Sequence, residues 1–177
     1  MKAIFFFDMD GVLAKWNEHA SEEETHQPGY FLEREVELSV IALVRRLKDE
    51  GADVRVLSSV YEDDHSAAEK RQWLMSVGLG DVDPVFVPYG HDKFRYVCPK
   101  EDEALILIDD YGKNLTNWER VGYIPVKFFN GVNNKPRLSV VDGEIKVHTD
   151  TWSGFSIDHR MSVDQMHVIL AAVAAAA

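Results

Sequence analysis

The chain alternates between short apolar runs and longer segments in which apolar residues recur every three or four positions. The apolar runs have the length of buried β-strands, and they lie at 2–7, 53–58, 85–87, 104–108 and 124–129. Helical spacing predicts helices near 36–47, 64–77 and 115–121, which Gly51, Gly78 and Gly122 would end. Asp64 is the residue expected to cap the second helix. This alternation predicts a Rossmann-like α/β fold, a parallel sheet with helices on both faces.

The last third of the chain follows a different pattern. Two short segments, 138–141 and 144–148, flank Asp142-Gly143, a dipeptide that favours a tight hairpin turn. A final helix is expected to begin near Ser162. We therefore expect one domain over residues 1–177, in which residues 131–177 form a C-terminal hairpin and helix.

The composition is that of an ordinary globular protein, with 46% hydrophobic and 28% charged residues. The 19 basic and 30 acidic residues give a net charge of −11. This charge disfavours a nucleic acid polymer or an acidic membrane surface as a partner, but it allows a small phosphorylated substrate in a local cationic pocket. The single cysteine, Cys98, cannot form an internal disulfide, which favours a cytoplasmic location.

Polar residues follow four of the predicted strands in succession. They are Asp8 and Asp10 after the first strand, Ser58 and Ser59 after the second, Lys93 after the third, and Asp109 and Asp110 after the fourth. Each taken alone is more typical of a turn, a helix cap or a surface charge. Ligands of open parallel sheets bind beyond the carboxyl ends of the strands, so the joint occurrence indicates a functional site at this edge.

The spacing of Asp8 and Asp10 is informative in itself. Residues two apart in an extended backbone point to the same side, so these carboxylates would project together. Like charges so close repel one another unless a cation, a proton or a substrate lies between them.

These residues resemble the motifs of a known family. The run DMDGVL at 8–13 is similar to the first motif, DxDG(V/T)L, of the haloacid dehalogenase (HAD) superfamily. Ser58, Lys93 and the Asp109-Asp110 pair resemble its second, third and fourth motifs, in the right order within residues 2–130. The run LIDDYGKNLTNW is most similar to the 5′(3′)-deoxyribonucleotidase-like branch of that superfamily.

The resemblance implies a Mg²⁺-dependent phosphatase and a role for each motif residue. Asp8 would be the nucleophile that forms an aspartyl-phosphate, and Asp10 the general acid and then the general base. Ser58, with Ser59 beside it, would bind phosphoryl oxygens, and Lys93 would neutralise the transferred group. Asp8, Asp109 and the backbone carbonyl of Asp10 would bind Mg²⁺, with Asp110 in contact with these ligands.

Physical chemistry agrees with this assignment. An anionic carboxylate that attacks a phosphate dianion needs a hard cation such as Mg²⁺ to overcome repulsion. Asp10 must hold a proton to act as an acid, and nearby negative charge raises the pKa of a carboxyl group. An acid at this position also favours phosphate transfer over dehalogenation, because a halide leaves without a proton.

Two other functions share some of these residues. Phosphoryl transfer to a second substrate, as in a mutase, would need a cap or a partner that excludes water. A phospho-acceptor signalling module also uses Asp, Mg²⁺ and Lys, but it places its adjacent acids after the first strand, the reverse of the order here. His65 and His91, on loops at strand ends, are further candidates for substrate contact.

The segment 14–32 is polar and rich in acid, so we expect a short, mobile flap in place of a cap domain. Either the hairpin near 138–148 or a neighbouring subunit of a homo-oligomer would then cover the site. The expected activity is broad hydrolysis of small phosphomonoesters, with a nucleoside monophosphate as the first candidate substrate.

Overall fold

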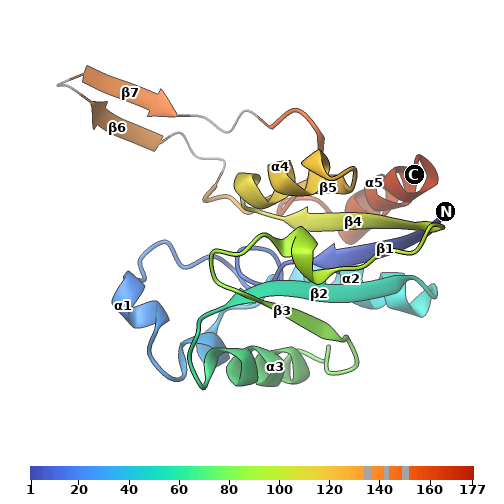
Figure 1. Cartoon of the computed structure of the whole chain (residues 1–177). Helices are drawn as coiled ribbons and strands as arrows, with labels where there is room; N and C mark the ends of the chain where they lie inside the picture. The colour runs from blue at the N-terminus through green and yellow to red at the C-terminus, as the bar shows by residue number, and fades with distance from the viewer. Residues whose placement is uncertain (134–136, 142–143, 149–151) are drawn as a thin grey trace.

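A six-stranded parallel sheet forms the centre of the computed structural model, which describes residues 1–133, 137–141, 144–148 and 152–177 (Figure 1). Along the sheet the strands follow the order β3-β2-β1-β4-β5-β8. Their bounds are β1 (Lys2–Phe7), β2 (Asp53–Val60), β3 (Pro84–Pro88), β4 (Glu103–Asp109), β5 (Ile124–Phe129) and β8 (Phe155–Asp158). Because β1 pairs with both β2 and β4, the loop that follows β1 lies in the middle of the carboxyl edge.

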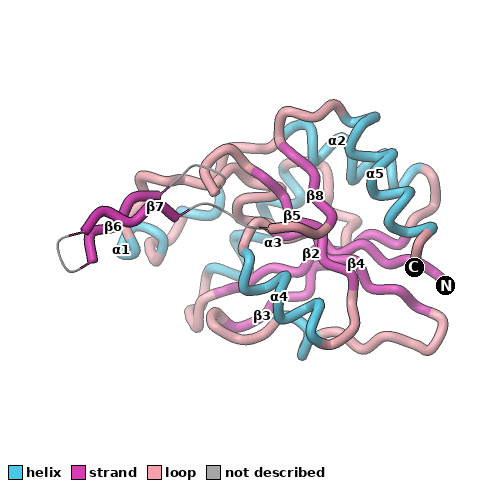
Figure 2. The backbone as a smooth tube through the Cα atoms, turned by 90° about the horizontal axis from the view of Figure 1, so that it is seen from above, coloured by secondary structure: helices cyan, strands magenta, loops and turns pink. Residues whose placement is uncertain are grey.

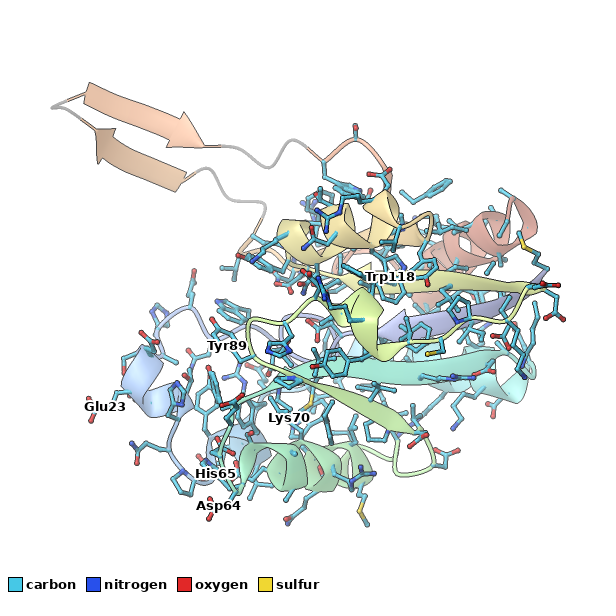
Figure 3. The ribbon with its side chains drawn as sticks, in the orientation of Figure 1. Glu23, Asp64, His65, Lys70, Tyr89 and Trp118 are labelled. Carbon is cyan, nitrogen blue, oxygen red and sulfur yellow. The ribbon has the colours of Figure 1, made fainter. Side chains whose placement is uncertain are left out.

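Helices cover both faces of this sheet, as the sequence predicted (Figure 2). One face carries α2 (Leu38–Asp49), α3 (Ser66–Ser76) and α5 (Val163–Ala175), and the other carries α4 (Gly112–Arg120) and the 3₁₀ helix η2 (Lys93–Tyr96). The alternation along β1 supplies both cores, since Phe5 and Phe7 face one side and Phe6 the other. Trp118 of α4 is fully buried, with its ring 5.8 Å from that of Phe6 (Figure 3).

The five predicted strands are present. β2 continues to Val60, so Ser58 and Ser59 lie within this strand and not after it, and two further details differ from the prediction. The sheet has a sixth parallel strand, β8, which pairs with β5 at the edge of the sheet. The N-cap of α3 is His65 and not Asp64. The carboxylate that accepts the first N–H groups there belongs to Asp63, whose Oδ1 accepts hydrogen bonds from the backbone N–H groups of His65 (3.1 Å) and Ser66 (2.7 Å). Asp64 points into solvent (Figure 3).

The C-terminal elements follow the predicted pattern. The strands β6 (Arg137–Val141) and β7 (Glu144–His148) form an antiparallel hairpin that extends away from the main sheet in Figure 1. The turn expected at Asp142-Gly143 lies outside the described residues. Ser162 caps α5, where its hydroxyl accepts the N–H of Gln165 at 3.2 Å. None of the helices in the described ranges has the length and apolar character that a membrane crossing requires.

Candidate active site

The loop after β1 brings the first two acids to the middle of the carboxyl edge. Asp8 is 7% exposed, and its Oδ1 accepts the backbone N–H of Met9 at 2.8 Å. Gly11 follows with φ of +85°, a backbone conformation that L side chains rarely adopt. A Cβ at Gly11 would lie 2.6 Å from Cγ of Asp110, so only glycine lets that carboxylate pack against the loop.

Three carboxylates converge beside this loop. Asp8, Asp109 and Asp110 each offer an oxygen, and these atoms lie within 4.8 Å of one another. Burial raises the pKa of Asp8 to about 6, with Lys93 opposing the shift and Asp109 and Asp10 adding to it. Burial, followed by the charges of Asp109 and Asp8, also raises the pKa of Asp110 well above its ordinary value. The ionised forms of these carboxyl groups are therefore destabilised in the protein, and a bound cation would stabilise them.

Lys93 supplies part of that charge. Its buried Nζ lies 2.8 Å from Asp8 Oδ1 and 2.7 Å from Asp109 Oδ2. Burial lowers the pKa of Lys93, but Asp109 and Asp8 outweigh this effect and raise the pKa above its usual range. The lysine that the sequence placed after the third strand is thus a charged partner of Asp8 and Asp109.

The two acids at the end of β4 have different surroundings. Both oxygens of Asp109 accept hydrogen bonds, Oδ2 from Lys93 and from Asn114 Nδ2 (2.9 Å), and Oδ1 from the N–H of Tyr111 (2.8 Å). Asp110 faces the loop after β1, where its Oδ2 accepts only the amide of Asn130 (2.9 Å) among the described residues. Both oxygens of Asp109 therefore accept hydrogen bonds within the protein, three in all, whereas Asp110 accepts one and has more capacity to bind another group.

The loop after β5 holds Asp110 in place, and the sequence analysis did not identify it. Asn130 Nδ2 also donates to the carbonyl of Gly11 at 3.1 Å. Asn133 Nδ2 donates to the backbone carbonyls of Asp110 (3.0 Å) and Phe128 (2.9 Å). Asn130 directly follows the fifth strand, so the rule that selected polar residues at strand ends would also have selected it.

The end of β2 is joined to Asp10 by a second lysine that the sequence analysis missed. Lys70 of α3 is 1% exposed, and its Nζ donates to Asp10 Oδ2, to Ser58 Oγ (3.0 Å) and to the carbonyl of Ser59 (2.5 Å). Ser58 is fully buried at this junction, and Ser59 contributes its backbone carbonyl there.

The segment expected to be a mobile flap contains two short helices, α1 (Glu22–Thr25) and the 3₁₀ helix η1 (Tyr30–Glu33). Glu69 of α3 fixes it, because its carboxylate accepts the N–H groups of Gly29 (2.6 Å) and Phe31 (3.3 Å). The Phe31 side chain is 4% exposed. The segment is held by Glu69, which lies outside it, and by the buried ring of Phe31. The polar composition of the segment therefore did not predict that it would be fixed in place.

Aromatic rings line the space between this segment and the end of β2. His26 stacks on Tyr61 with ring centroids 3.8 Å apart, and Tyr61 lies 5.2 Å from Tyr89 and 6.1 Å from Phe31. The Tyr89 side chain is 68% exposed (Figure 3). We call these four residues the aromatic cluster. Its exposed members are His26 and Tyr89, which directly follows β3, while Tyr61 is half-buried three residues beyond Ser58.

The two candidate histidines are engaged elsewhere. His91 Nδ1 lies 2.7 Å from the hydroxyl of Tyr96. His65 Nδ1 lies 3.5 Å from carboxylate oxygens of Asp63 and Asp64 at the start of α3. Neither imidazole contacts the carboxylate cluster.

Of the comparisons with known proteins, the one with solved structures gives matches. No family model and no curated protein matches the sequence. The chain is similar to the crystal structure of D,D-heptose 1.7-bisphosphate phosphatase from B. bronchiseptica complexed with magnesium and phosphate, with a TM-score of 0.51 and 15% sequence identity. The match covers 72% of this chain and 80% of that one. A likeness at this identity establishes the fold alone, a Rossmann-like α/β fold that the chain shares with that phosphatase.

Proposed function

We propose that this chain is a Mg²⁺-dependent phosphatase of the HAD superfamily that hydrolyses small phosphomonoesters through an aspartyl-phosphate on Asp8. One observation carries this proposal: buried Asp8 is paired with Lys93 and grouped with Asp109 and Asp110 at the middle of the carboxyl edge. The fold agrees, because the structural neighbour is a phosphatase that was crystallised with magnesium and phosphate.

The residues of the chain divide the reaction into two steps. A carboxylate oxygen of Asp8 bonds to phosphorus while the bond to the leaving oxygen breaks, and Asp10 gives that oxygen a proton. Asp10 then takes a proton from a water molecule, whose oxygen displaces Asp8 and releases phosphate. Lys93 stabilises the negative charge that develops on the transferred group.

The donor atoms of the cluster suit Mg²⁺, which prefers oxygen ligands. The raised pKa values of Asp8 and Asp110 support a cation at this point. The sequence assigned Asp8, Asp109 and the Asp10 carbonyl as ligands. Since Asp109 already accepts three hydrogen bonds and Asp110 accepts one, we propose instead that Asp110 takes the direct role and that Asp109 orients Lys93. The ion would supply the charge that lets an anionic nucleophile approach an anionic phosphate.

The aromatic cluster supports a substrate with a planar ring, and a nucleoside monophosphate remains the first candidate. Exposed aromatic side chains stack on nucleobases and gain about 1–3 kcal/mol per base. Tyr89→Ala is therefore expected to raise the KM of a nucleoside monophosphate about tenfold and to leave that of a small alkyl phosphate unchanged. Equal changes for both substrates would show that the cluster does not bind the leaving group.

The deciding experiment measures phosphate release from a panel of nucleotides and sugar phosphates, with Mg²⁺ and with EDTA. We expect activity that EDTA abolishes, that Asp8→Asn eliminates, and that the exposed control Asp64→Asn retains. Near-normal turnover of p-nitrophenyl phosphate by Asp8→Asn would show that the covalent mechanism is wrong. Stable phosphate on the protein without release would instead indicate a phospho-acceptor module.

A further inference from the structure

Lys70 has a location that packing alone does not explain. The side chain lies on the face of α3 that is turned toward the sheet, and it is 1% exposed (Figure 3). A lysine ammonium has three donors, and here they reach three acceptors: Asp10 Oδ2, Ser58 Oγ and the carbonyl of Ser59. Burial of a charge is costly, so an apolar residue would be the more stable choice if the position served packing alone.

The segment above Lys70 closes over this charge. The Phe31 ring centroid lies 4.5 Å from Lys70 Nζ, a cation–π contact that also shields the ammonium from water. The neighbouring Glu69 holds the backbone of Gly29 and Phe31. Of two successive residues of α3, Glu69 thus binds the covering segment and Lys70 binds the Asp10 carboxylate.

Solvation of Asp10 does not require this lysine. The Asp10 side chain is 23% exposed, so water would hydrate its carboxylate if the ammonium were absent. The ammonium instead fixes the orientation of the Asp10 carboxylate, because it donates both to Oδ2 and to two groups near the end of β2, Ser58 Oγ and the Ser59 carbonyl. Within the described part of the chain Oδ1 accepts no hydrogen bond, which leaves that oxygen for proton exchange.

We propose that Lys70 is a positioning residue that acts on turnover through Asp10, holding its carboxylate in a fixed relation to Ser58 and the end of β2. The inference rests on the proposed function, in which Asp10 transfers protons in both steps. A misplaced Asp10 would slow the second step for every substrate, because water must lose a proton to Asp10 as its oxygen bonds to phosphorus. The first step would survive with p-nitrophenyl phosphate, since nitrophenolate leaves without a proton.

The test compares Lys70→Met with Arg71→Met, which removes the exposed cation of the next residue on α3. With p-nitrophenyl phosphate we expect Lys70→Met to lower kcat about 100-fold and to lower KM with it, so that kcat/KM, which reports the unaffected first step, changes by less than about threefold. Rapid mixing with p-nitrophenyl phosphate should give a burst near one nitrophenolate per protein before slow steady turnover. In an Asp10→Asn background, Lys70→Met should have almost no further effect, because the group through which it acts is already impaired.

Two results would overturn the inference: Lys70→Met behaving like Arg71→Met, or rate losses that multiply with those of Asp10→Asn. If circular dichroism shows that Lys70→Met does not fold, the same cycle with Lys70→Arg gives the answer. If the wild-type protein were inactive, both the proposed function and the role of Lys70 would be wrong. If the wild type were active and dependent on Asp8, but Lys70→Met had normal turnover, only the role of Lys70 would be wrong.

Discussion

A methyl group added at Gly11 tests how the chain holds Asp110. Gly11 has φ of +85°, so alanine there costs about 1–2 kcal/mol of backbone strain. The new Cβ would also lie 2.6 Å from Asp110 Cγ and closer still to Oδ2, so the carboxylate would have to move away from Asn130. We expect Gly11→Ala to lose about 1–2 kcal/mol of unfolding free energy. The Mg²⁺ concentration for half-maximal activity should rise about 10–100-fold, as when a supporting group of a metal ligand is lost.

Gly51→Ala is the matched control for this variant. Gly51 also has φ of +85°, but a Cβ there would meet nothing within 4 Å. It follows α2, so its substitution adds the same backbone strain and moves no side chain of the site. Urea unfolding without metal should show similar losses for the two variants, and Mg²⁺ titration of activity should separate them. An equal Mg²⁺ requirement in both would refute the role of Asp110 as a ligand held against Gly11.

Two further predictions concern pH and the covering segment. Because burial raises the pKa of Asp8 to about 6, the metal-free folded state binds an extra proton between about pH 4 and pH 6. Its unfolding free energy should therefore fall by about 3 kcal/mol as pH rises through that range; urea unfolding at a series of pH values should show a smaller decline in Asp8→Asn. Replacing Glu22, Glu23 and Glu24 together by Gln should change hydrolysis of small phosphomonoesters little, because α1 buries none of its residues. A preference for one nucleotide that disappears in this triple variant would contradict that expectation.

The sheet was predictable because its buried strands are apolar runs separated by helices of regular spacing. The edge strand β8 lacked this signal. It is four residues long, pairs with β5 alone, and buries only Ile157, while Ser156 and Asp158 are polar. A strand with one buried side chain has no periodicity to detect, so its pairing is set by tertiary contacts.

The convergence of the candidate residues at the carboxyl edge could be predicted from the sequence, but the different surroundings of Asp109 and Asp110 could not. Adjacent residues at a strand end point in opposite directions, so one of the two must face Lys93 and the other the loop after β1. Which one does so depends on how η2 lies across the sheet, and this places Lys93 Nζ 2.7 Å from Asp109. The sequence order of the motifs carries no information on that geometry.

The hydrophobic pattern of the sequence could have located Lys70 on the buried face of its helix, but it could not have identified the partners of Lys70. The buried positions of α3 are Ser66, Glu69, Lys70, Trp73 and Leu74, a stripe at helical spacing. Trp73 and Leu74 located this helix in the sequence, and extending their stripe one turn back would have placed two charged residues on its buried face. Buried charges require partners, so the pattern identifies Glu69 and Lys70 as residues in need of them. It does not identify the partners, because three of the five are backbone groups, and the two side chains, those of Asp10 and Ser58, come from other segments of the chain. A charged pair within the buried stripe of a helix therefore indicates, from sequence alone, a helix that faces polar groups of a site and not only the apolar core.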